Sequence, residues 1–327
     1  MRVLVTGGAG FIGSHVCEAL LQQGHDICLL DNFCDYYSPM FKRENIHHVK
    51  LVAKMCKKDV QVIEADVRDK SALDKHFSTQ SYDAVIHLAA CTGVRPSIEN
   101  AFFYSDVNIN GTITILECMR RHQVKNLVFA SSSSIYGNSD KVPYSESDAA
   151  LCPISPYAAS KKAGELMCHA YHHLYSMNIA CLRLFSVYGP RQRPDLAIYK
   201  FTDKIYANSP LPFFGDGKMS RDYTYVDDTV SGILLALDWV CKGEKKYEIF
   251  NIGESYAVSL DEVVSALENT IGKSATINRL PAPPGDVQLT WADISKAERV
   301  LGYKPKTSFE AGIEKFVAWF SAKRRGK

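Results

Sequence analysis

The chain has 327 residues, of which 46% are hydrophobic and 23% are charged, and its formal net charge is +2. That length exceeds one small domain and suits a nucleotide-binding domain joined to a smaller partner. Acidic and basic residues are interspersed and nearly balanced, which argues against a nucleic acid as the partner. No apolar run approaches the ~18 residues that a membrane span needs, and no signal peptide precedes the first apolar segment. We therefore expect a cytoplasmic protein with no membrane span.

Strand-like and helix-like segments alternate over the first 185 residues. Both faces of the strand-like segments are apolar, which is typical of a parallel sheet covered by helices on both sides. We predict strands near residues 2–6, 26–30, 60–64, 83–88, 125–130 and 178–184, and helices near 11–23, 39–54, 71–78, 100–122 and 156–176.

The sequence thus predicts an α/β fold with a Rossmann-type doubly wound parallel sheet in a domain of residues 1–185. Residues 186–327 contain short strand-like segments, smaller helices and loops rich in proline and glycine. We expect them to form mainly a smaller, discontinuous C-terminal lobe that binds the substrate, with some segments returning to the first domain.

A glycine-rich turn lies between the first predicted strand and the first predicted helix. Gly7, Gly10 and Gly13 would permit a tight turn and a close approach of backbone N–H groups to a pyrophosphate. The second predicted strand leads to Asp31, 18 residues past Gly13, where a carboxylate can accept both hydroxyls of an adenosine ribose and repel a 2′-phosphate. The pattern indicates NAD in preference to NADP. A glycine-rich turn with an incidental aspartate is the alternative.

Tyr157 and Lys161 stand four residues apart in a predicted helix and therefore share one face. A free phenol, with a pKa of about 10, is a poor base at neutral pH, and an adjacent ammonium together with a nicotinamide cation favours the phenolate. Ser132, in the serine run after the fifth predicted strand, could hydrogen-bond the same substrate oxygen. These groups suit the removal of a proton from a sugar hydroxyl while a hydride leaves its carbon. Taken alone, the Tyr–Lys pair also fits an ordinary helix surface.

Ten cysteines are present, and none forms a Cys-x-x-Cys motif. Most fall in apolar segments, as expected of small core residues in a reducing compartment. His169, His172 and His173 cluster in one predicted helix without acidic or thiol ligands at metal spacing, so we expect no metal site.

Together these motifs resemble the extended short-chain dehydrogenase/reductases, and specifically the NAD-dependent nucleotide-sugar 4-epimerases. The resemblance implies a bound NAD, a UDP-sugar in the cleft, and a homodimer built from the helices near 100–122 and 156–176. It covers essentially the whole length, through Thr6 to His15, Asp31-Asn32, His87 to Ala90, Asn108, Ser131 to Gly137, Tyr157 to Lys161, Val187 to Arg191, Phe214 to Gly217, Arg221-Asp222, Gly285-Asp286 and Ala292-Asp293.

The resemblance also implies roles for individual residues. Tyr157, as the phenolate, would take the proton from the sugar O4, Lys161 would lower the tyrosine pKa and hold the nicotinamide ribose, and Ser132 would bond O4. The cofactor would contact residues near the carboxyl ends of the predicted strands, where ligands bind in such sheets. The implied contacts are Gly7, Gly10, Phe11, Ile12, Gly13, Asp31, Asn32, Asp66, Val67, Leu88, Ala89, Ala90, Asn108, Tyr157 and Lys161.

The two residues after Ser132 narrow the reaction. The related 4,6-dehydratases carry Asp-Glu at these positions, and the related decarboxylases carry Glu at the second. This chain has Ser133 and Ser134, neither of which can serve as a carboxyl acid or base. The resemblance therefore favours epimerisation over dehydration and decarboxylation.

The segment from Ser186 to Ala197 resembles that of UDP-glucuronate 4-epimerases, which carry an Arg-Pro-Asp motif at Arg193. An arginine fork suits bidentate binding of a C6 carboxylate. Holding that carboxylate would also oppose loss of CO2 from the 4-keto sugar, which is a β-keto acid. Arg95 is a second candidate for the same anion, and Arg193 could instead serve the diphosphate or lie on the surface. The implied substrate contacts are Arg95, Ser133, Ser134, Ser186, Arg193, Phe213, Phe214, Arg221 and Asp286.

In the second lobe, the resemblance implies that Arg221 binds the diphosphate and Asp286 the uridine ribose. Phe213 and Phe214 would line the uracil site, with core packing an equal alternative for both. Other functions that fit the same scaffold are a 4-epimerase for UDP-glucose or UDP-N-acetylglucosamine, a decarboxylase, and a non-catalytic NAD-binding protein. The last of these would be expected to lack one of the three catalytic residues, all of which are present.

Overall fold

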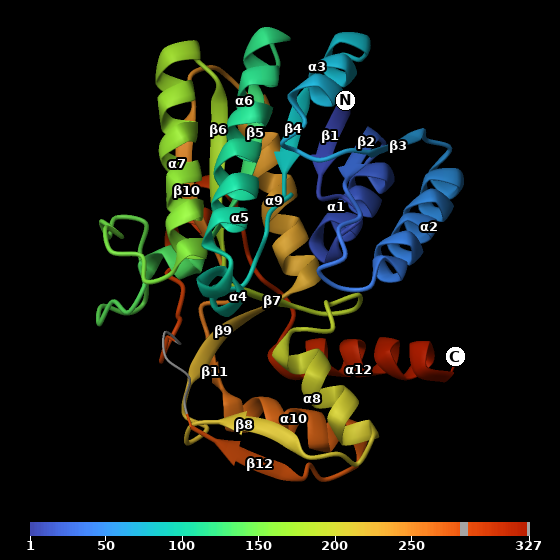
Figure 1. Cartoon of the computed structure of the whole chain (residues 1–327), viewed down its shortest axis with the longest axis vertical. Helices are drawn as coiled ribbons and strands as arrows, with labels where there is room; N and C mark the ends of the chain where they lie inside the picture. Colours follow the sequence, from blue (N-terminus) through green and yellow to red (C-terminus); the bar gives the residue numbers. More distant parts are fainter. Residues whose placement is uncertain (282–286, 326–327) are drawn as a thin grey trace.

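The structure is a computed structural model that describes residues 1–281 and 287–325. Its centre is a parallel sheet with the strand order β10-β6-β5-β4-β1-β2-β3, seen in the upper part of Figure 1. The order reverses between β1 and β4, which is the point where doubly wound sheets bind their ligands. The strands are β1 (Arg2–Thr6), β2 (Asp26–Asp31), β3 (Val60–Glu64), β4 (Ala84–His87), β5 (Asn126–Ser132), β6 (Asn178–Leu184) and β10 (Tyr247–Ile252).

Helices cover both faces of this sheet because its strands are apolar on both. Val3 and Val5 of β1 belong to a core shared with α1 (Phe11–Gln22), α2 (Pro39–Cys56) and α9 (Val226–Cys241). Leu4 faces the opposite core, which includes side chains from α3, α6 and α7. The helices on that side are α3 (Lys70–Thr79), α4 (Val94–Glu99), α5 (Ala101–Ser105), the π-helix η1 (Asp106–Asn110), α6 (Gly111–Arg121) and α7 (Pro156–Tyr175).

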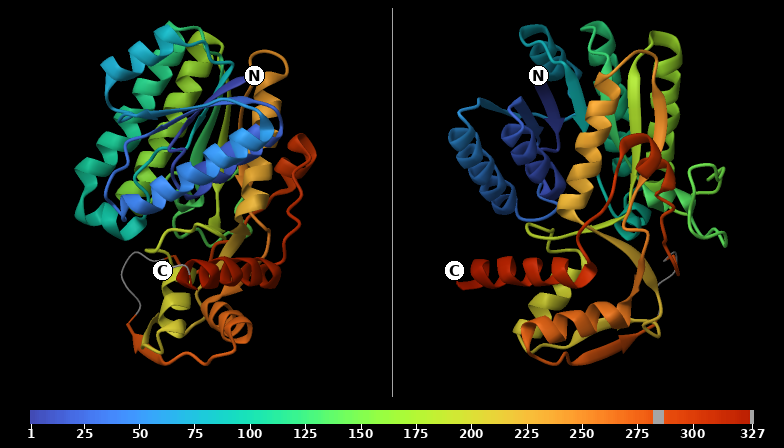
Figure 2. Two further views of the ribbon diagram at one scale, coloured as in Figure 1. Left: turned by 90° about the vertical axis from the view of Figure 1, so that its right-hand side faces the viewer. Right: turned by 180° about the vertical axis from the view of Figure 1, so that it is seen from behind.

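A second lobe lies below the carboxyl ends of the central strands (Figure 1 and Figure 2). It has a three-stranded sheet in the order β11-β9-β7 and a two-stranded sheet of β12 and β8. Its elements are β7 (Ser186–Tyr188), α8 (Ala197–Tyr206), β8 (Leu211–Phe214), β9 (Ser220–Tyr225), β11 (Ala257–Ser259), α10 (Leu260–Ile271), β12 (Ile277–Leu280) and α12 (Phe309–Arg325), and the chain also forms η2 (Ser133–Tyr136) and α11 (Ser295–Leu301).

The predicted α/β class and parallel sheet are confirmed, with one difference in detail. The segment predicted as one helix near 100–122 consists of α5, η1 and α6 in succession, and α4 precedes it. As expected, segments after residue 186 return to the central sheet. Helix α9 packs on it, and β10 pairs with β6 from Tyr247 opposite Ile179 to Ile252 opposite Leu184. The division at residue 185 stays a prediction about domains.

Within the residues that the structure describes, no helix is both long enough and apolar enough to cross a membrane.

Candidate active site

The glycine turn between β1 and α1 lies at the carboxyl end of β1, next to the reversal of strand order. Gly7 has φ +69°, and a Cβ on it would lie 2.8 Å from the Ala89 nitrogen. A Cβ on Gly13 would lie 2.2 Å from the Gly7 oxygen. Both positions therefore need glycine. Because α1 starts directly after the turn, its first backbone N–H groups have no helical partners, and the turn fits a pyrophosphate.

Asp31 ends β2, and three donors orient its buried carboxylate. The backbone N–H groups of Ala9 and Phe33 donate to it at 3.3 and 2.9 Å, and the Lys42 ammonium lies 3.0 Å from Oδ1. The Lys42 side chain is also buried. Asp31, the predicted ribose ligand, thus forms an ion pair with Lys42 of α2, a contact that no sequence spacing indicated.

The residues after β3 form a second polar group beside Asn32. The Asn32 amide donates to Asp66 at 2.9 Å, and Arg68 donates to both oxygens of the same carboxylate at 2.9 Å. The Arg68 hydrogen bonds lower the pKa of Asp66 to about 2, against a smaller opposing effect of burial. Val67 packs so close to Gly111 that a Cβ there would lie 2.7 Å from its Cγ2. Both predicted contacts, Asp66 and Val67, therefore lie on ordered backbone at this end of the sheet.

Asn108 lies buried in η1, where it joins the loop after β4 to α7. Its Oδ1 accepts from the Cys91 N–H at 2.8 Å, and its Nδ2 donates to the Cys91 oxygen and to Ser160 Oγ, both at 2.9 Å. Ser160 donates in turn to the backbone carbonyl oxygen of Tyr157 at 2.8 Å. The amide thus holds the segment that follows Leu88, Ala89 and Ala90 against the helix that carries Tyr157.

Helix α7 brings Tyr157 to the end of β5. The helix begins at Pro156 because Ser155 caps it, accepting from the Ala158 N–H at 3.1 Å, and proline is well tolerated at this first position. Burial raises the pKa of the Tyr157 phenol, while a hydrogen bond with Ser132 and the charge of Arg193 lower it in part. The structure therefore brings together the phenol and the serine that the sequence singled out.

Lys161 is buried one helical turn beyond Tyr157. Its ammonium donates to the Ala130 oxygen at 2.7 Å and lies 5.3 Å from the centre of the Phe129 ring. Burial lowers its pKa to about 8. In this arrangement Ser132 and Arg193, and not Lys161, are the groups that lower the pKa of Tyr157. The role of Lys161 in activating the tyrosine stays a prediction.

His87 ends β4 between the hydroxyls of Thr6 and Thr112, and no role was predicted for it from the sequence. Thr112 donates to the backbone oxygen of Asn108 at 2.6 Å, so its own hydroxyl oxygen can accept from His87 Nε2 at 3.1 Å. His87 Nδ1 then accepts from the Thr6 hydroxyl at 2.6 Å, and Thr6 accepts from the Ala89 N–H at 3.2 Å. Burial, followed by the charge of Lys161, lowers the pKa of His87 to about 3, so the ring is neutral. This chain of hydrogen bonds fixes Ala89 beside the glycine turn.

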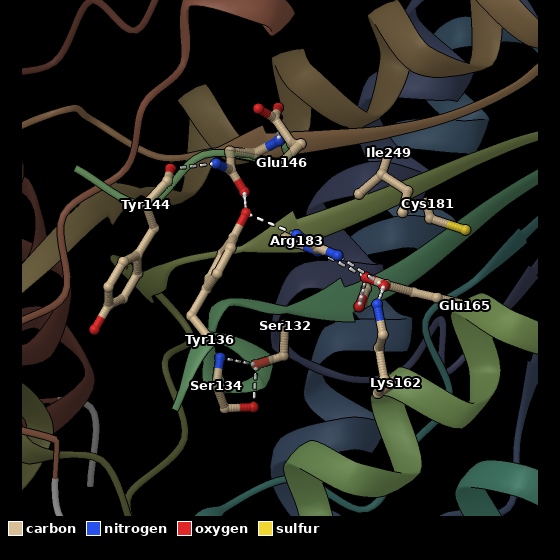
Figure 3. Close-up of polar contacts among 12 residues, drawn as sticks. Ser132, Ser134, Tyr136, Tyr144, Glu146, Lys162, Glu165, Cys181, Arg183 and Ile249 are labelled. Atoms are coloured by element: carbon tan, nitrogen blue, oxygen red, sulfur yellow. Dashed lines mark hydrogen bonds and ion pairs between the residues drawn. The ribbon is translucent and has the colours of Figure 1, made fainter. Parts of the chain in front are cut away.

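A buried ion pair supports the serine run at the end of β5 (Figure 3). Glu165 of α7 and Arg183 of β6 are each only 1% exposed and are joined by two hydrogen bonds of 2.9 Å. Ser131 donates to Glu165 at 2.7 Å, and Arg183 donates to the Tyr136 hydroxyl at 2.9 Å. Because these contacts connect α7 to the strand end before Ser132, they fix the distance between the serine and Tyr157. Glu165 stands four residues past Lys161, a spacing that could have drawn attention to it.

Two serines of the run also hydrogen-bond each other. Ser134 donates from both its N–H and its hydroxyl to Ser132 Oγ, at 3.2 and 2.9 Å. Ser133 begins η2, directly after the strand. The structure therefore places Ser132, Ser133 and Ser134 at one sheet end close to Tyr157, with hydroxyl groups and no carboxylate among them.

Arg193 follows β7 and reaches the site from the second part of the chain. Its Nε and Nη2 donate to the two oxygens of Asp195 at 3.0 and 2.7 Å, and its Nη1 donates to the Thr92 hydroxyl. The Tyr36 ring centre lies 5.4 Å from its guanidinium carbon. The fork is thus already paired, and its charge acts on Tyr157. The surface alternative for Arg193 is wrong, since its side chain is only 17% exposed.

The other predicted substrate contacts lie on the second lobe or face it. Arg95 of α4 stacks on Phe214 of β8, with 4.9 Å between its guanidinium carbon and the ring centre. Arg221 of β9 donates to the Ser220 oxygen at 3.0 Å. Phe213 is buried and Phe214 half-buried, and Ser186 begins β7. Asp286 lies outside the described residues.

Residues 1–281 and 287–325 contain no group of three or more His, Cys, Asp or Glu side chains placed to hold a metal ion.

The chain belongs to the GDP-mannose 4,6-dehydratase family, whose model matches residues 4–316. It is 42% identical to a UDP-glucuronate 4-epimerase of Thermodesulfobacterium geofontis over 317 residues, which cover 97% of this chain and 95% of that protein.

Two solved structures place this similarity in three dimensions. The UDP-glucuronic acid 4-epimerase of Bacillus cereus, crystallised with UDP-glucuronic acid and NAD, superposes with a TM-score of 0.90 at 38% identity and covers 99% of this chain and 100% of that one. The UDP-glucose 4-epimerase of Thermotoga maritima, crystallised with UDP-glucose, gives a TM-score of 0.89 at 32% identity, with 99% and 100% covered. The fold alone therefore does not separate the two sugars.

Proposed function

We propose that this chain is an NAD-dependent 4-epimerase that converts UDP-glucuronate to UDP-galacturonate. The observation that carries the proposal is the buried Tyr157 phenol, which hydrogen-bonds Ser132 and lies within reach of the Arg193 charge. The glycine turn and the oriented Asp31 carboxylate fit a dinucleotide beside it. The named relatives with UDP-glucuronate and NAD support the same assignment.

The residues divide the chemistry between them. Tyr157, as the phenolate, takes the proton from the sugar O4, and Ser132 hydrogen-bonds the same oxygen. NAD, held by the glycine turn and Asp31, would supply a reversible acceptor for the C4 hydride. Inversion at C4 requires the 4-keto sugar to turn over between the two hydride transfers. Tyr157 then gives the proton back to O4, so that the protein ends the cycle as it began.

The absence of carboxylates after Ser132 supports epimerisation. Water elimination and decarboxylation in this family both use acidic residues next to the serine or threonine, and Ser133 and Ser134 provide only hydroxyls. Arg193 supports a carboxylate substrate, because a largely buried guanidinium near the reacting tyrosine favours an anion.

The test is incubation of the purified protein with UDP-glucuronate and identification of the product sugar by NMR. UDP-galacturonate supports the proposal. A UDP-pentose would identify a decarboxylase, and turnover of UDP-glucose or UDP-N-acetylglucosamine without turnover of UDP-glucuronate would move the assignment to a neutral-sugar epimerase.

For the cofactor, we expect protein stripped of nucleotide to bind NAD+ more tightly than NADP+, because the Asp31 carboxylate would face a 2′-phosphate at close range and low dielectric. Calorimetry on the wild type and on Asp31→Asn measures this. In the variant the preference should narrow, since Lys42 loses its carboxylate partner and can attract the phosphate. Asp26→Asn, at the exposed start of the same strand, is the control. Equal wild-type affinities would show that Asp31 does not face the ribose.

We also infer a homodimer formed through α5 and α7. Phe102 is 93% exposed and Phe103 40% exposed on α5, where they line a pocket of about 500 Å³ together with Ile109 of η1. Leu166 and Leu174 of α7 are 61% and 64% exposed. Large apolar side chains gathered on neighbouring helices are typical of a subunit interface.

Light scattering after gel filtration tests the interface. Phe102→Glu should convert the dimer to a monomer, because it places a charge where the apolar surfaces meet. Met55→Glu, a matched change on the exposed side of α2 where Met55 is 82% exposed, should leave the dimer intact. A dimer that survives Phe102→Glu would place the interface elsewhere.

A cytoplasmic location remains part of the proposal, supported by thiols such as Cys17, Cys118 and Cys168 that pack in the core as small apolar side chains.

A further inference from the structure

Two side chains of α1, His15 and Glu18, contact the segment just before Arg193. His15 Nε2 lies 3.0 Å from the Pro190 oxygen. Burial, followed by the charge of Arg191, lowers the pKa of His15 to about 3, so the ring is neutral and Nε2 donates its hydrogen. One turn further along α1, Glu18 accepts two hydrogen bonds from Arg191, at 2.9 and 2.7 Å. The consecutive residues Pro190 and Arg191 are therefore held by neighbouring turns of α1.

The backbone at this contact is strained. Arg191 has φ +66°, in the left-handed region that residues with a side chain seldom adopt. Such a conformation persists only where the surroundings enforce it, and it concentrates at functional sites. Gly189, two residues earlier, has φ +141°, and a Cβ there would lie 2.7 Å from Val226 Cγ1. The paired bonds from Arg191 to Glu18 are the contacts that hold the strained residue in place.

The held segment ends at Arg193, whose surroundings belong to the site. The Gln192 N–H donates to the Gly189 oxygen at 3.1 Å, which closes a turn over the strained residue. Arg193 follows at once and meets Asp195, Thr92 and the Tyr36 ring. Because only one residue separates Arg191 from Arg193, releasing Arg191 changes where the Arg193 guanidinium can lie.

We propose that Glu18 and His15 are positioning residues that fix Arg193 for the C6 carboxylate of the sugar, an inference that rests on the proposed function. α1 begins directly after the glycine turn, so one helix supports both the dinucleotide turn and the segment with the selective arginine. Glu18 touches neither substrate nor cofactor in this scheme. It sets substrate choice through Arg191. The contacts of His15 with Pro190 and of Glu18 with Arg191 are called the clamp below.

Steady-state kinetics of Glu18→Gln on UDP-glucuronate and UDP-glucose test the proposal. We expect KM for UDP-glucuronate to rise roughly tenfold, the factor that corresponds to one weakened charge-assisted contact. kcat should change less than about threefold, because a contact made equally in the bound and transition states appears in KM. KM for UDP-glucose should hardly change. An equal rise for both sugars, or none for either, would overturn the proposal.

Two further variants separate positioning from stability. Arg191→Gly removes the guanidinium that pairs with Glu18 and relieves the backbone strain at φ +66°. KM for UDP-glucuronate should therefore rise, while the melting temperature of this variant stays at or above that of Glu18→Gln. Glu44→Gln removes the exposed ion pair from α2 to Lys323 of α12 and should leave all constants unchanged. A KM for UDP-glucuronate equal to the wild-type value in Arg191→Gly would show that the clamp does not determine substrate binding.

Hydrogen exchange of the peptide at residues 189–196 gives a readout that needs no sugar. NAD+ should slow exchange of this peptide in the wild type, because α1 is held at both the glycine turn and the clamp, and it should not do so in Glu18→Gln. If wild type fails to turn over UDP-glucuronate, the proposed function fails while this measurement still decides the clamp. Identical exchange in wild type and Glu18→Gln would overturn the clamp even in an active enzyme.

Discussion

Replacing Tyr157 by phenylalanine should abolish epimerisation while leaving the fold and NAD binding nearly intact. The phenol is the proposed acceptor of the O4 proton, and loss of a general base typically lowers a rate by ~10²–10⁴-fold. The ring itself is retained, so its edge-to-face contact with Tyr104, at 6.4 Å between ring centres, persists. The variant therefore removes one buried hydroxyl and its hydrogen bond with Ser132.

Single-turnover and steady-state rates on UDP-glucuronate measure the loss, with calorimetry for NAD+ as the check on the cofactor site. Tyr104→Phe is the matched control, because it removes a hydroxyl that donates to the backbone oxygen of Thr92 at 2.8 Å and has no proposed contact with O4. Its rate should fall by less than about tenfold. A Tyr157→Phe rate within about threefold of wild type would refute the general-base assignment.

The pH dependence follows from the same contacts. Burial raises the pKa of Tyr157, so the phenol is protonated at low pH, and activity should rise with pH as the phenolate forms. Arg193 lowers that pKa, so replacing it by a neutral residue should shift the rise in activity to higher pH.

Most of the central sheet was predictable because each of its first six strands is a continuous apolar run in the sequence. Each of the first six strands lies within two residues of its predicted bounds, from β1 at Arg2–Thr6 to β6 at Asn178–Leu184. Continuous apolar runs between glycine, asparagine and aspartate residues set those bounds locally. The juxtaposition of Tyr157 and Ser132 was predictable from the same pattern, since Ser132 ends β5 and Tyr157 lies in the first turn of α7.

The helix near 100–122 shows where local pattern failed. Its period predicts one continuous helix, yet five residues from Asp106 to Asn110 widen into a π-helix. Asn108 lies in that turn and uses its amide oxygen and both amide hydrogens on Cys91 and Ser160, which are distant in sequence. A tertiary contact of this kind has no periodic signal.

The supporting residues of the site were hidden in the same way. Glu18 meets Arg191 across 173 positions, and Thr6 meets His87 across 81. Lys42 reaches Asp31 only because α2 folds back beside α1. Motifs identify residues at the ends of strands, whereas the contacts that orient those residues depend on how helices from distant parts of the chain pack.

Replacing Arg193 by lysine should impair UDP-glucuronate turnover much more than the loss of one non-specific charge would. Lysine keeps the positive charge but not the planar, paired donors that suit a carboxylate. A buried charge-assisted contact is worth roughly 1.5–3 kcal/mol, so kcat/KM should fall by about ten- to a hundredfold. Residual activity on UDP-glucose, which has no carboxylate, should hardly change. NMR should also detect some UDP-4-keto-pentose if the loosened β-keto acid loses CO2.

Asp195 makes the test sharper, because it already accepts two hydrogen bonds from the Arg193 fork. Asp195→Asn keeps the arginine and removes the carboxylate that competes with the substrate for it. This variant should therefore bind UDP-glucuronate at least as tightly as wild type, while Arg193→Lys binds it less tightly. If Arg193→Lys lowers turnover of both sugars equally, the arginine serves the diphosphate or the fold. In that outcome the choice of UDP-glucuronate loses its main physical support, although Tyr157 and the cofactor site would still define a 4-epimerase.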